Sequence, residues 1–254
     1  MMKILLSGIG GHMGAEVLKL AGEGYRGAKI IAGVDPMGCS LQDVPCYKSF
    51  AEVPEEICRE TDLIVDFSHH SGTAAMVGFA LQNRLPLVVA TTGQTPEERG
   101  LIEQAAAEIP VFFAANFSMG IALLIDLAKK AAAALPEAEI EIVEAHHDRK
   151  IDAPSGTALA IAKALQEVRP EATIHSGRSG MEKRTKEEIG IAAIRMGNLA
   201  GMHEVLIGTP NQTITLKHET HSRALFAEGA LAAADFLKDQ PAGLYDMNTM
   251  ISRL

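Results

Sequence analysis

Short apolar runs alternate with longer amphipathic segments through the first half of the chain. The runs are rich in aliphatic and β-branched residues and predict buried strands at 3–8, 29–35, 61–68, 86–93 and 110–118. Helical spacing lies between them, at 12–24, 71–83 and 95–109. Strands that are apolar throughout and separated by helices predict a parallel sheet covered on both faces. We therefore expect an α/β domain in this half.

The pattern changes after Asn116. Helix, strand, helix, strand, paired strands and helix are predicted in turn at 119–135, 139–147, 154–168, 188–197, 202–220 and 223–239. The turn sequence at 209–212 lies between two alternating runs and predicts a hairpin. The polar run 176–188 predicts a loop. This half reads as a smaller α+β domain.

Composition narrows the class of protein. The chain has 254 residues and a net charge of −9, which argues against nucleic acid as a partner. No apolar stretch is long enough to span a membrane, and the apolar N-terminal run is too short for a signal peptide. Cys39, Cys46 and Cys58 are odd in number and show no CxxC spacing. That pattern argues against a disulfide framework or a zinc site, and the chain is expected to be cytoplasmic.

A glycine-rich turn, GIGGHMG at 8–14, lies between the first strand and the first helix. Backbone N–H groups at such a helix start favour a pyrophosphate. Met13 breaks the strict GxGxxG spacing, so the turn alone fits a dinucleotide site and a plain tight turn equally. Asp35 ends the second strand about 20 residues later, where a carboxylate holds ribose hydroxyls. Asp35 as a simple turn residue before Pro36 is the alternative.

The carboxylate of Asp35 also bears on the choice of nucleotide. It would repel a 2′-phosphate, and residues 36–38 contain no Lys or Arg. We expect NADH to be used at least as well as NADPH. Small and polar residues close three further strands at 66–68, 90–93 and 115–118, where a nicotinamide would bind, although each could be an ordinary loop. His69 and His70 are read as solvated loop residues.

The segment EAHHDRKIDAPSGTA, residues 144–158, holds the densest candidate chemistry. Ser155 is a natural helix N-cap, and the N–H groups of Gly156 and Thr157 would then face an anion. Upstream, His146, His147 and Lys150 add three potential cations. Adjacent histidines are poor metal chelators, so no metal is expected. From the residues alone, an anion site with acid catalysis and a polar loop are equally favoured.

This segment closely resembles the signature of the dihydrodipicolinate reductase family. The resemblance extends in order along essentially the whole chain, through GIGGHMG, DFS, ATTG, ANFSMGI, IRMGNLAGMHEV and HETHSRALFAEGALAAADFL. The family implies a Rossmann-like domain over 1–117 that is completed by 228–254. It also implies a smaller α+β domain over 118–227 that binds substrate and forms a homotetramer. The implied reaction is NAD(P)H-dependent formation of tetrahydrodipicolinate, in lysine biosynthesis by the diaminopimelate route, from a small dicarboxylate.

The resemblance also implies roles for individual residues. His146 matches the family's catalytic acid/base, and Lys150 matches its proton donor. The positions that match or adjoin its substrate-carboxylate contacts are His147, Ser155, Gly156 and Thr157. The positions that match its NADH or NADPH contacts are Gly8, Ile9, Gly10, Gly11, His12, Met13, Asp35, Thr91, Thr92, Gly93, Ala115, Asn116 and Phe117. His12 stands where the family often has Arg, which puts one phosphate contact in doubt.

Two other functions fit the same architecture. One is a related Rossmann-type amino-acid dehydrogenase, whose oxidative chemistry would not need the HHxxK pattern before a helix-capping PSGT. The other is a nicotinamide-binding sensor without turnover, which would not need to keep a proton donor. Both alternatives make His146 and Lys150 the residues to test.

Overall fold

The computed structural model describes residues 1–39 and 43–253. Contacts between residues divide the chain into two compact units. Unit 1 joins Met1–Ser118 to Ala224–Leu254, and unit 2 is the inserted segment Met119–Arg223. Residue 254, the end of the predicted returning segment, lies outside the described residues.

Unit 1 is built on a parallel sheet with the strand order β12-β6-β5-β4-β1-β2-β3. Its strands are β1 (Met2–Ser7), β2 (Ala28–Val34), β3 (Cys46–Tyr47), β4 (Leu63–Asp66), β5 (Leu87–Val89), β6 (Pro110–Phe113) and β12 (Gly243–Tyr245). The order runs outward in both directions from β1, so the sheet changes direction of growth there. The predicted parallel sheet and its α/β class are confirmed.

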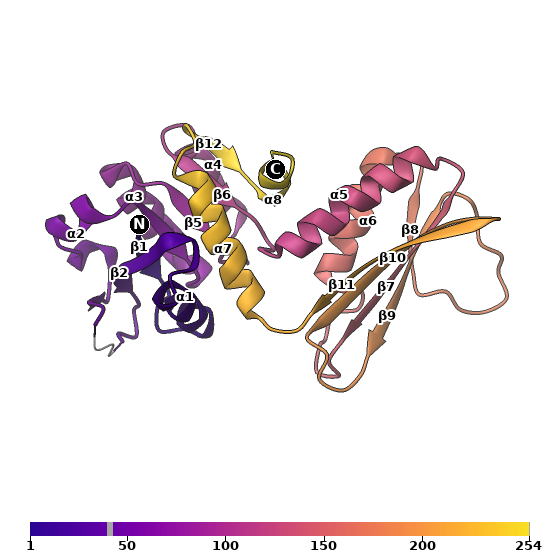
Figure 1. Cartoon of the computed structure of the whole chain (residues 1–254), viewed down its shortest axis with the longest axis horizontal. Coiled ribbons are helices and arrows are strands. Elements are labelled where there is room, and N and C mark those ends of the chain that lie inside the picture. Colours follow the sequence, from indigo (N-terminus) through magenta and orange to yellow (C-terminus); the bar gives the residue numbers. More distant parts are fainter. Residues whose placement is uncertain (40–42, 254) are drawn as a thin grey trace. The chain divides into compact units, whose positions relative to one another are not determined.

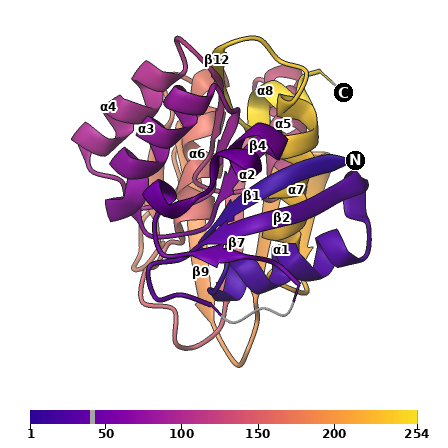
Figure 2. The ribbon, with the colours of Figure 1, turned by 90° about the vertical axis from the view of Figure 1, so that its left-hand side faces the viewer.

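Helices cover both faces of this sheet. They are α1 (His12–Gly22), α2 (Glu55–Glu60), α3 (Thr73–Asn83), α4 (Pro96–Ala105), α7 (Ala224–Leu237) and α8 (Met247–Ile251), with 3-10 turns at η1 (Tyr25–Gly27), η2 (Phe50–Glu52) and η3 (His70–Gly72). Figure 2 shows α3 and α4 side by side on one face, and α1 with α7 on the other. Apolar strands such as β4 are buried on both sides, which explains their continuous hydrophobic sequences.

Helix α7 packs close to the rest of unit 1. Six of its 14 residues are alanine, and Ala227, Ala230 and Ala233 are fully buried. A Cβ added at Gly229 would lie 1.7 Å from the carbonyl oxygen of Phe117, a distance that no side chain tolerates. The small residues of α7 therefore permit contact between its backbone and the end of the N-terminal segment.

Unit 2 is a mixed sheet with two helices on one face. The strand order is β11-β10-β7-β9-β8, and α5 packs against α6 (Figure 1). The elements are α5 (Met119–Ala134), β7 (Glu139–His146), α6 (Gly156–Val168), β8 (Thr173–Ser176), β9 (Glu188–Arg195), β10 (Gly201–Thr209) and β11 (Gln212–Thr220). β10 and β11 form the predicted hairpin. Ile142, Ile161 and Val205 belong to the core between helices and sheet.

Several short elements were not predicted, among them β3, β8, β12, α2 and α8. The cysteine pattern argued against a disulfide framework and did not predict the single bond between Cys39 and Cys46, with 6.0 Å between their Cα atoms. Residues Cys46 and Gly33 are partners in the β2–β3 pairing, which returns the chain to the end of β2. That proximity depends on a two-residue strand and is invisible in cysteine spacing. The cysteine pattern therefore no longer favours a reducing compartment.

No helix within the described ranges is long and apolar enough to cross a membrane.

Replacing Gly229 with alanine should destabilise unit 1, because the new methyl group collides with the Phe117 carbonyl. We expect a loss of about 1–3 kcal/mol in the free energy of unfolding, measured by urea denaturation. Gly78→Ala in α3 is the matched control, since a Cβ there meets nothing within 4 Å. The control should be neutral or stabilising by up to about 1 kcal/mol. Equal stability of the two variants would contradict the proposed close contact.

Candidate active site

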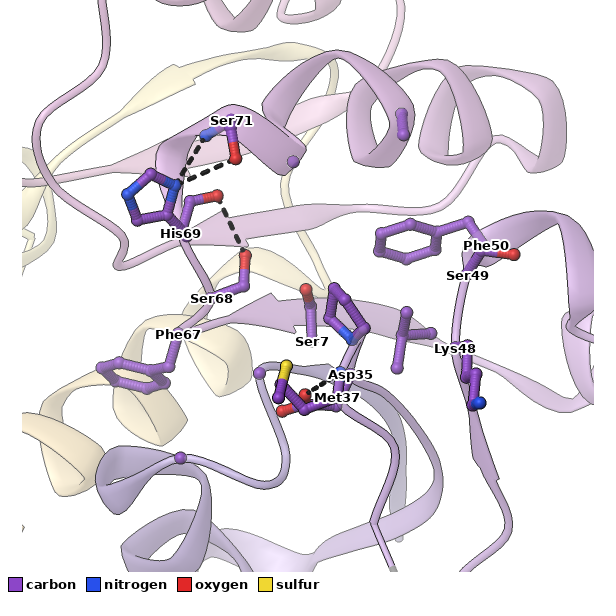
Figure 3. Close-up of a pocket in the computed structure, with 16 residues that line it drawn as sticks. Ser7, Asp35, Met37, Lys48, Ser49, Phe50, Phe67, Ser68, His69 and Ser71 are labelled. Atoms are coloured by element: carbon purple, nitrogen blue, oxygen red, sulfur yellow. Dashed lines mark hydrogen bonds between the residues drawn. The ribbon is translucent and has the colours of Figure 1, made fainter.

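A cavity of about 580 Å³ opens at the carboxyl ends of the central strands of unit 1 (Figure 3). Ser7 and Gly8 reach it from β1, and Asp35 reaches it from the end of β2. Phe67 and Ser68 follow β4 on the other side. Strands β2 and β4 flank β1, so the cavity lies where the strand order reverses. Open α/β sheets bind their ligands at this position.

Glycine is required at two positions of the turn that borders the cavity. Gly8 has φ +76°, and a Cβ there would lie 2.4 Å from the carbonyl oxygen of Phe67. A Cβ at Gly14 would lie 2.4 Å from the carbonyl oxygen of Gly8. The turn therefore folds tightly between β1, the segment after β4 and the first turn of α1. This cradle fits a dinucleotide whose phosphates approach the start of α1.

Asp35 is held at the rim of the cavity by backbone donors. The N–H of Gly10 donates to its Oδ2 at 3.0 Å, and the N–H of Met37 donates to its Oδ1 at 3.0 Å. Figure 3 shows Lys48 and Phe50 on another wall of the same cavity. Residues 36–38 after Asp35 contain no Lys or Arg. Lys48 comes close only through the pairing of β3 with β2, which the local sequence does not reveal.

The other predicted cofactor residues of the glycine turn do not all face the cavity. Gly11 lines it. Ile9 is buried, and a Cβ at Gly33 would collide with its side chain, so Ile9 packs under β2. His12 is exposed at the start of α1, and Met13 is half-buried beside it.

The predicted residues near the ends of β5 and β6 lie elsewhere in unit 1. A smaller cavity of about 170 Å³ is lined by Thr91, Thr92, Gly93 and Ala115 together with Gln94, Arg99 and Phe113. The Asn116 side-chain oxygen accepts the N–H of Ser118 at 2.8 Å. Phe117 is buried against the rings of Phe67 and Phe112, so its side chain belongs to the core.

The paired histidines after β4 make specific contacts, although His69 is exposed and His70 is half-buried. His69 lines the larger cavity, and its Nδ1 accepts the N–H of Ser71 at 3.3 Å. His70 Nδ1 lies 2.9 Å from the carboxylate of Glu98, at the start of α4. This contact joins the loop after β4 to the helix that follows Gly93.

In unit 2, alternate residues along one face of β7 change from apolar to polar toward the end of the strand. Ile140 and Ile142 face the helices, and Glu144 and His146 continue the same face toward the end of the strand. The register places Arg195 of β9 opposite His146, and His203 of β10 opposite Glu144. Three neighbouring strands thus bring four polar side chains to one end of the sheet.

Glu144 is fully buried at the centre of this group. Its Oε2 lies 2.6 Å from Nδ1 of His146, and its Oε1 accepts the N–H of Ser155 at 3.0 Å. Arg195 donates to both oxygens, at 2.7 and 2.9 Å. Burial opposes ionisation, but the hydrogen bonds from Arg195, His146 and Ser155 outweigh it and hold the pKa of the Glu144 carboxyl below its usual value.

His203 lies edge-on to His146, with 5.2 Å between the ring centroids. Its Nε2 is 3.2 Å from the hydroxyl oxygen of Ser155. Burial, followed by the neighbouring charge of His146, lowers the pKa of His203 to about 4. His203 is therefore neutral near pH 7.

The remaining predicted substrate residues lie in the loop after β7 and at the start of α6. His147 is half-buried, and its N–H donates to the carbonyl of Leu199. Lys150 Nζ forms an ion pair with Asp152 at 2.8 Å. Ser155 is buried and caps α6, because its hydroxyl oxygen accepts the N–H of Ala158. Gly156 is exposed in the first turn of that helix, and Thr157 follows it half-buried.

Sequence reasoning missed Glu144, Arg195 and His203 as members of this group. Glu144 carried one available signal, since an acidic residue on the apolar face of a half-buried strand needs a partner. Arg195 and His203 come from strands far along the chain, and only the register shows that they meet it. Among the described residues, no cluster of His, Cys, Asp or Glu is arranged to hold a metal ion.

Family models match nearly the whole chain. Residues 2–117 match the model described as dihydrodipicolinate reductase, N-terminus, and residues 120–251 match the model described as dihydrodipicolinate reductase, C-terminus. A 4-hydroxy-tetrahydrodipicolinate reductase of Caldanaerobacter subterraneus subsp. tengcongensis is 43% identical, covering 100% of this chain and 99% of the relative. That of Clostridium tetani is 39% identical, covering 99% and 98%.

Solved structures agree with these matches. A dipicolinate-bound dihydrodipicolinate reductase from Paenisporosarcina sp. TG-14 superimposes with a TM-score of 0.79 at 27% identity, covering 97% of each chain. An aspartate dehydrogenase from Thermotoga maritima superimposes with a TM-score of 0.54 at 13% identity, covering 95% of this chain and 98% of that one. The second likeness extends to the fold alone.

Proposed function

Because the chain belongs to the dihydrodipicolinate reductase family, and is thus an NAD(P)H-dependent oxidoreductase, we propose that it reduces 4-hydroxy-tetrahydrodipicolinate, or dihydrodipicolinate, to tetrahydrodipicolinate. The observation that supports this most directly is the group at the end of β7, where His146, Lys150 and the start of α6 lie within one short stretch. Dipicolinate in the solved relative is a dicarboxylate, as this substrate would be. A cytoplasmic location and a homotetramer, both implied by the family, are part of the proposal.

The two units divide the work. Unit 1 would hold the nucleotide with the Gly8–Gly14 turn and Asp35, and unit 2 would hold the dicarboxylate. The chain passes between the units at Ser118–Met119 and Arg223–Ala224. We propose that these two crossings act as hinges that bring the reacting groups together.

A bound reduced nicotinamide supplies a hydride to the ring of the substrate, a cyclic unsaturated imine. The residues of the chain then have two tasks. Lys150, His147 and the N–H groups of Gly156 and Thr157 hold the two carboxylates near the positive end of α6. His146 places the proton that completes the reduction on the ring carbon next to the one that accepts the hydride. One hydride and one proton together balance the reduction of the double bond of dihydrodipicolinate, and 4-hydroxy-tetrahydrodipicolinate must first lose its hydroxyl group as water to form that double bond.

The proposed activity can be tested with the purified protein, a coupled synthase, pyruvate and aspartate semialdehyde. We expect substrate-dependent oxidation of NADH, followed as loss of nicotinamide absorbance. An amino-acid dehydrogenase would instead reduce NAD⁺ in the presence of an amino acid. A sensor would bind NADH without turnover, and either outcome would remove the proposed function.

His146→Gln should lower kcat by about 100-fold or more, with little change in KM, because it removes the proton donor. Lys150→Ala should lower kcat and raise KM, because it removes a cation that holds the substrate. The controls are His175→Gln on β8 and Lys163→Ala on the exposed side of α6, which should behave as wild type. Survival of kcat in the His146 variant would exclude its role as acid.

The nucleotide cavity predicts that kcat/KM for NADH is at least equal to that for NADPH, because Asp35 repels a 2′-phosphate. Asp35→Asn should raise kcat/KM for NADPH relative to NADH by about tenfold, or about 1.4 kcal/mol. Lys48→Ala should reduce only the NADPH value, since Lys48 lines the same cavity and carries a positive charge. A large advantage for NADPH in the wild type would overturn the assignment of Asp35.

A further inference from the structure

The proposed reaction gives His146 a proton to deliver, but it leaves the buried carboxylate of Glu144 without a task. Buried charges are costly, and they persist where partners compensate them. Glu144 is fully buried and accepts hydrogen bonds from three different elements: His146 of β7, Arg195 of β9 and Ser155 at the start of α6. A carboxylate placed this way can act on the neighbouring imidazole.

The first effect is on the orientation of the ring. An ionised carboxylate only accepts hydrogen bonds, so the contact at 2.6 Å requires a proton on Nδ1 of His146. The proton that can be exchanged is then the one on Nε2. Gly201 of β10 keeps the space beside Nε2 open, because a Cβ there would lie 3.1 Å from that nitrogen. Ring orientation and tautomer are thus both set by the surroundings.

Charged and titratable groups also lie around the ring. Glu144 on β7 contacts Nδ1 of His146, Arg195 on β9 donates to the same carboxylate, and His203 on β10 lies edge-on to the ring. The ion pair of Lys150 with Asp152 lies in the loop after β7. His203 is neutral near pH 7 and adds no second positive charge.

We propose that Glu144 is a positioning residue that fixes the tautomer of His146 and stabilises its protonated form, and that Arg195 tunes this effect by sharing the carboxylate. The inference rests on the proposed function, in which protonated His146 is the acid. The same carboxylate also anchors the first residue before α6 through the N–H of Ser155. It therefore couples the proton donor to the helix start that would hold the substrate.

Opposite shifts in the pH profile of kcat test this proposal. The acid is active when protonated, so kcat falls on the alkaline side. Glu144→Gln removes the negative neighbour and should move the alkaline limb to lower pH by about one unit or more. Arg195→Gln removes the positive neighbour and should move the limb to higher pH. A purely structural role would lower activity in both variants without opposite shifts.

The size of the effects separates positioning from substrate binding. Glu144→Gln should lower kcat by about 10- to 100-fold and change KM by less than about threefold. Glu144→Asp keeps the charge, so its alkaline limb should stay near the wild-type position even if kcat falls. Glu139→Gln makes the same substitution at the exposed start of β7, and its profile should match the wild type.

Binding of dipicolinate and of NADH, measured by fluorescence or calorimetry, shows that each variant is folded. If Glu144→Gln does not fold, Arg195→Gln carries the test alone. The proposal is then overturned if the alkaline limb of the Arg195→Gln profile does not move to higher pH. If His146→Gln loses kcat while the alkaline limb moves in neither Glu144→Gln nor Arg195→Gln, the role of Glu144 is wrong and the proposed function stands. If His146→Gln keeps its kcat, the acid assignment itself fails.

Discussion

A negative charge inside unit 2 is the constraint on which its site depends. Glu144 can stay ionised only because Arg195, His146 and Ser155 all donate to it. Each donor is tied to a different part of the unit: β9, the end of β7, and the residue that caps α6. The one carboxylate thus fixes the position of the imidazole relative to the helix start. Removing a single donor would leave a buried charge under-compensated, so these three elements are held together as a set.

The cavity of unit 1 depends on a different constraint, which is the close approach of a backbone turn to its neighbours. Here the determining residues have no side chain. Gly8 and Gly14 allow the turn to fold against Phe67 and the first turn of α1, at distances that exclude a Cβ. Asp35 is then supported by two N–H groups at the rim of the cavity. The proposed nucleotide site is shaped by backbone, whereas the proposed site of unit 2 is shaped by buried charge.

This difference explains how far the sequence could predict the molecule. Continuous apolar runs predicted the parallel sheet, and the local spacing of His146, Lys150 and Ser155 predicted a cluster, because both signals lie within short segments. Arg195 and Lys48 could not be found in this way, since each reaches its site through the register of a strand pair. The disulfide between Cys39 and Cys46 depends on the same pairing of β2 with β3. Residues that meet through the register of paired strands can be recognised as neighbours only when the fold is known.

The return of the chain to unit 1 has a consequence for the order of folding during synthesis. Helix α7 and strand β12 are made last, yet α7 packs on α1, β5 and β6, and β12 pairs with β6. All the residues of unit 2 leave the ribosome before them. Unit 2 can therefore complete its own core first, while part of one sheet face in the nascent unit 1 is still uncovered. A ribosome that stalls in the last stretch of the message would leave the N-terminal unit incomplete, although its own first strands were translated long before.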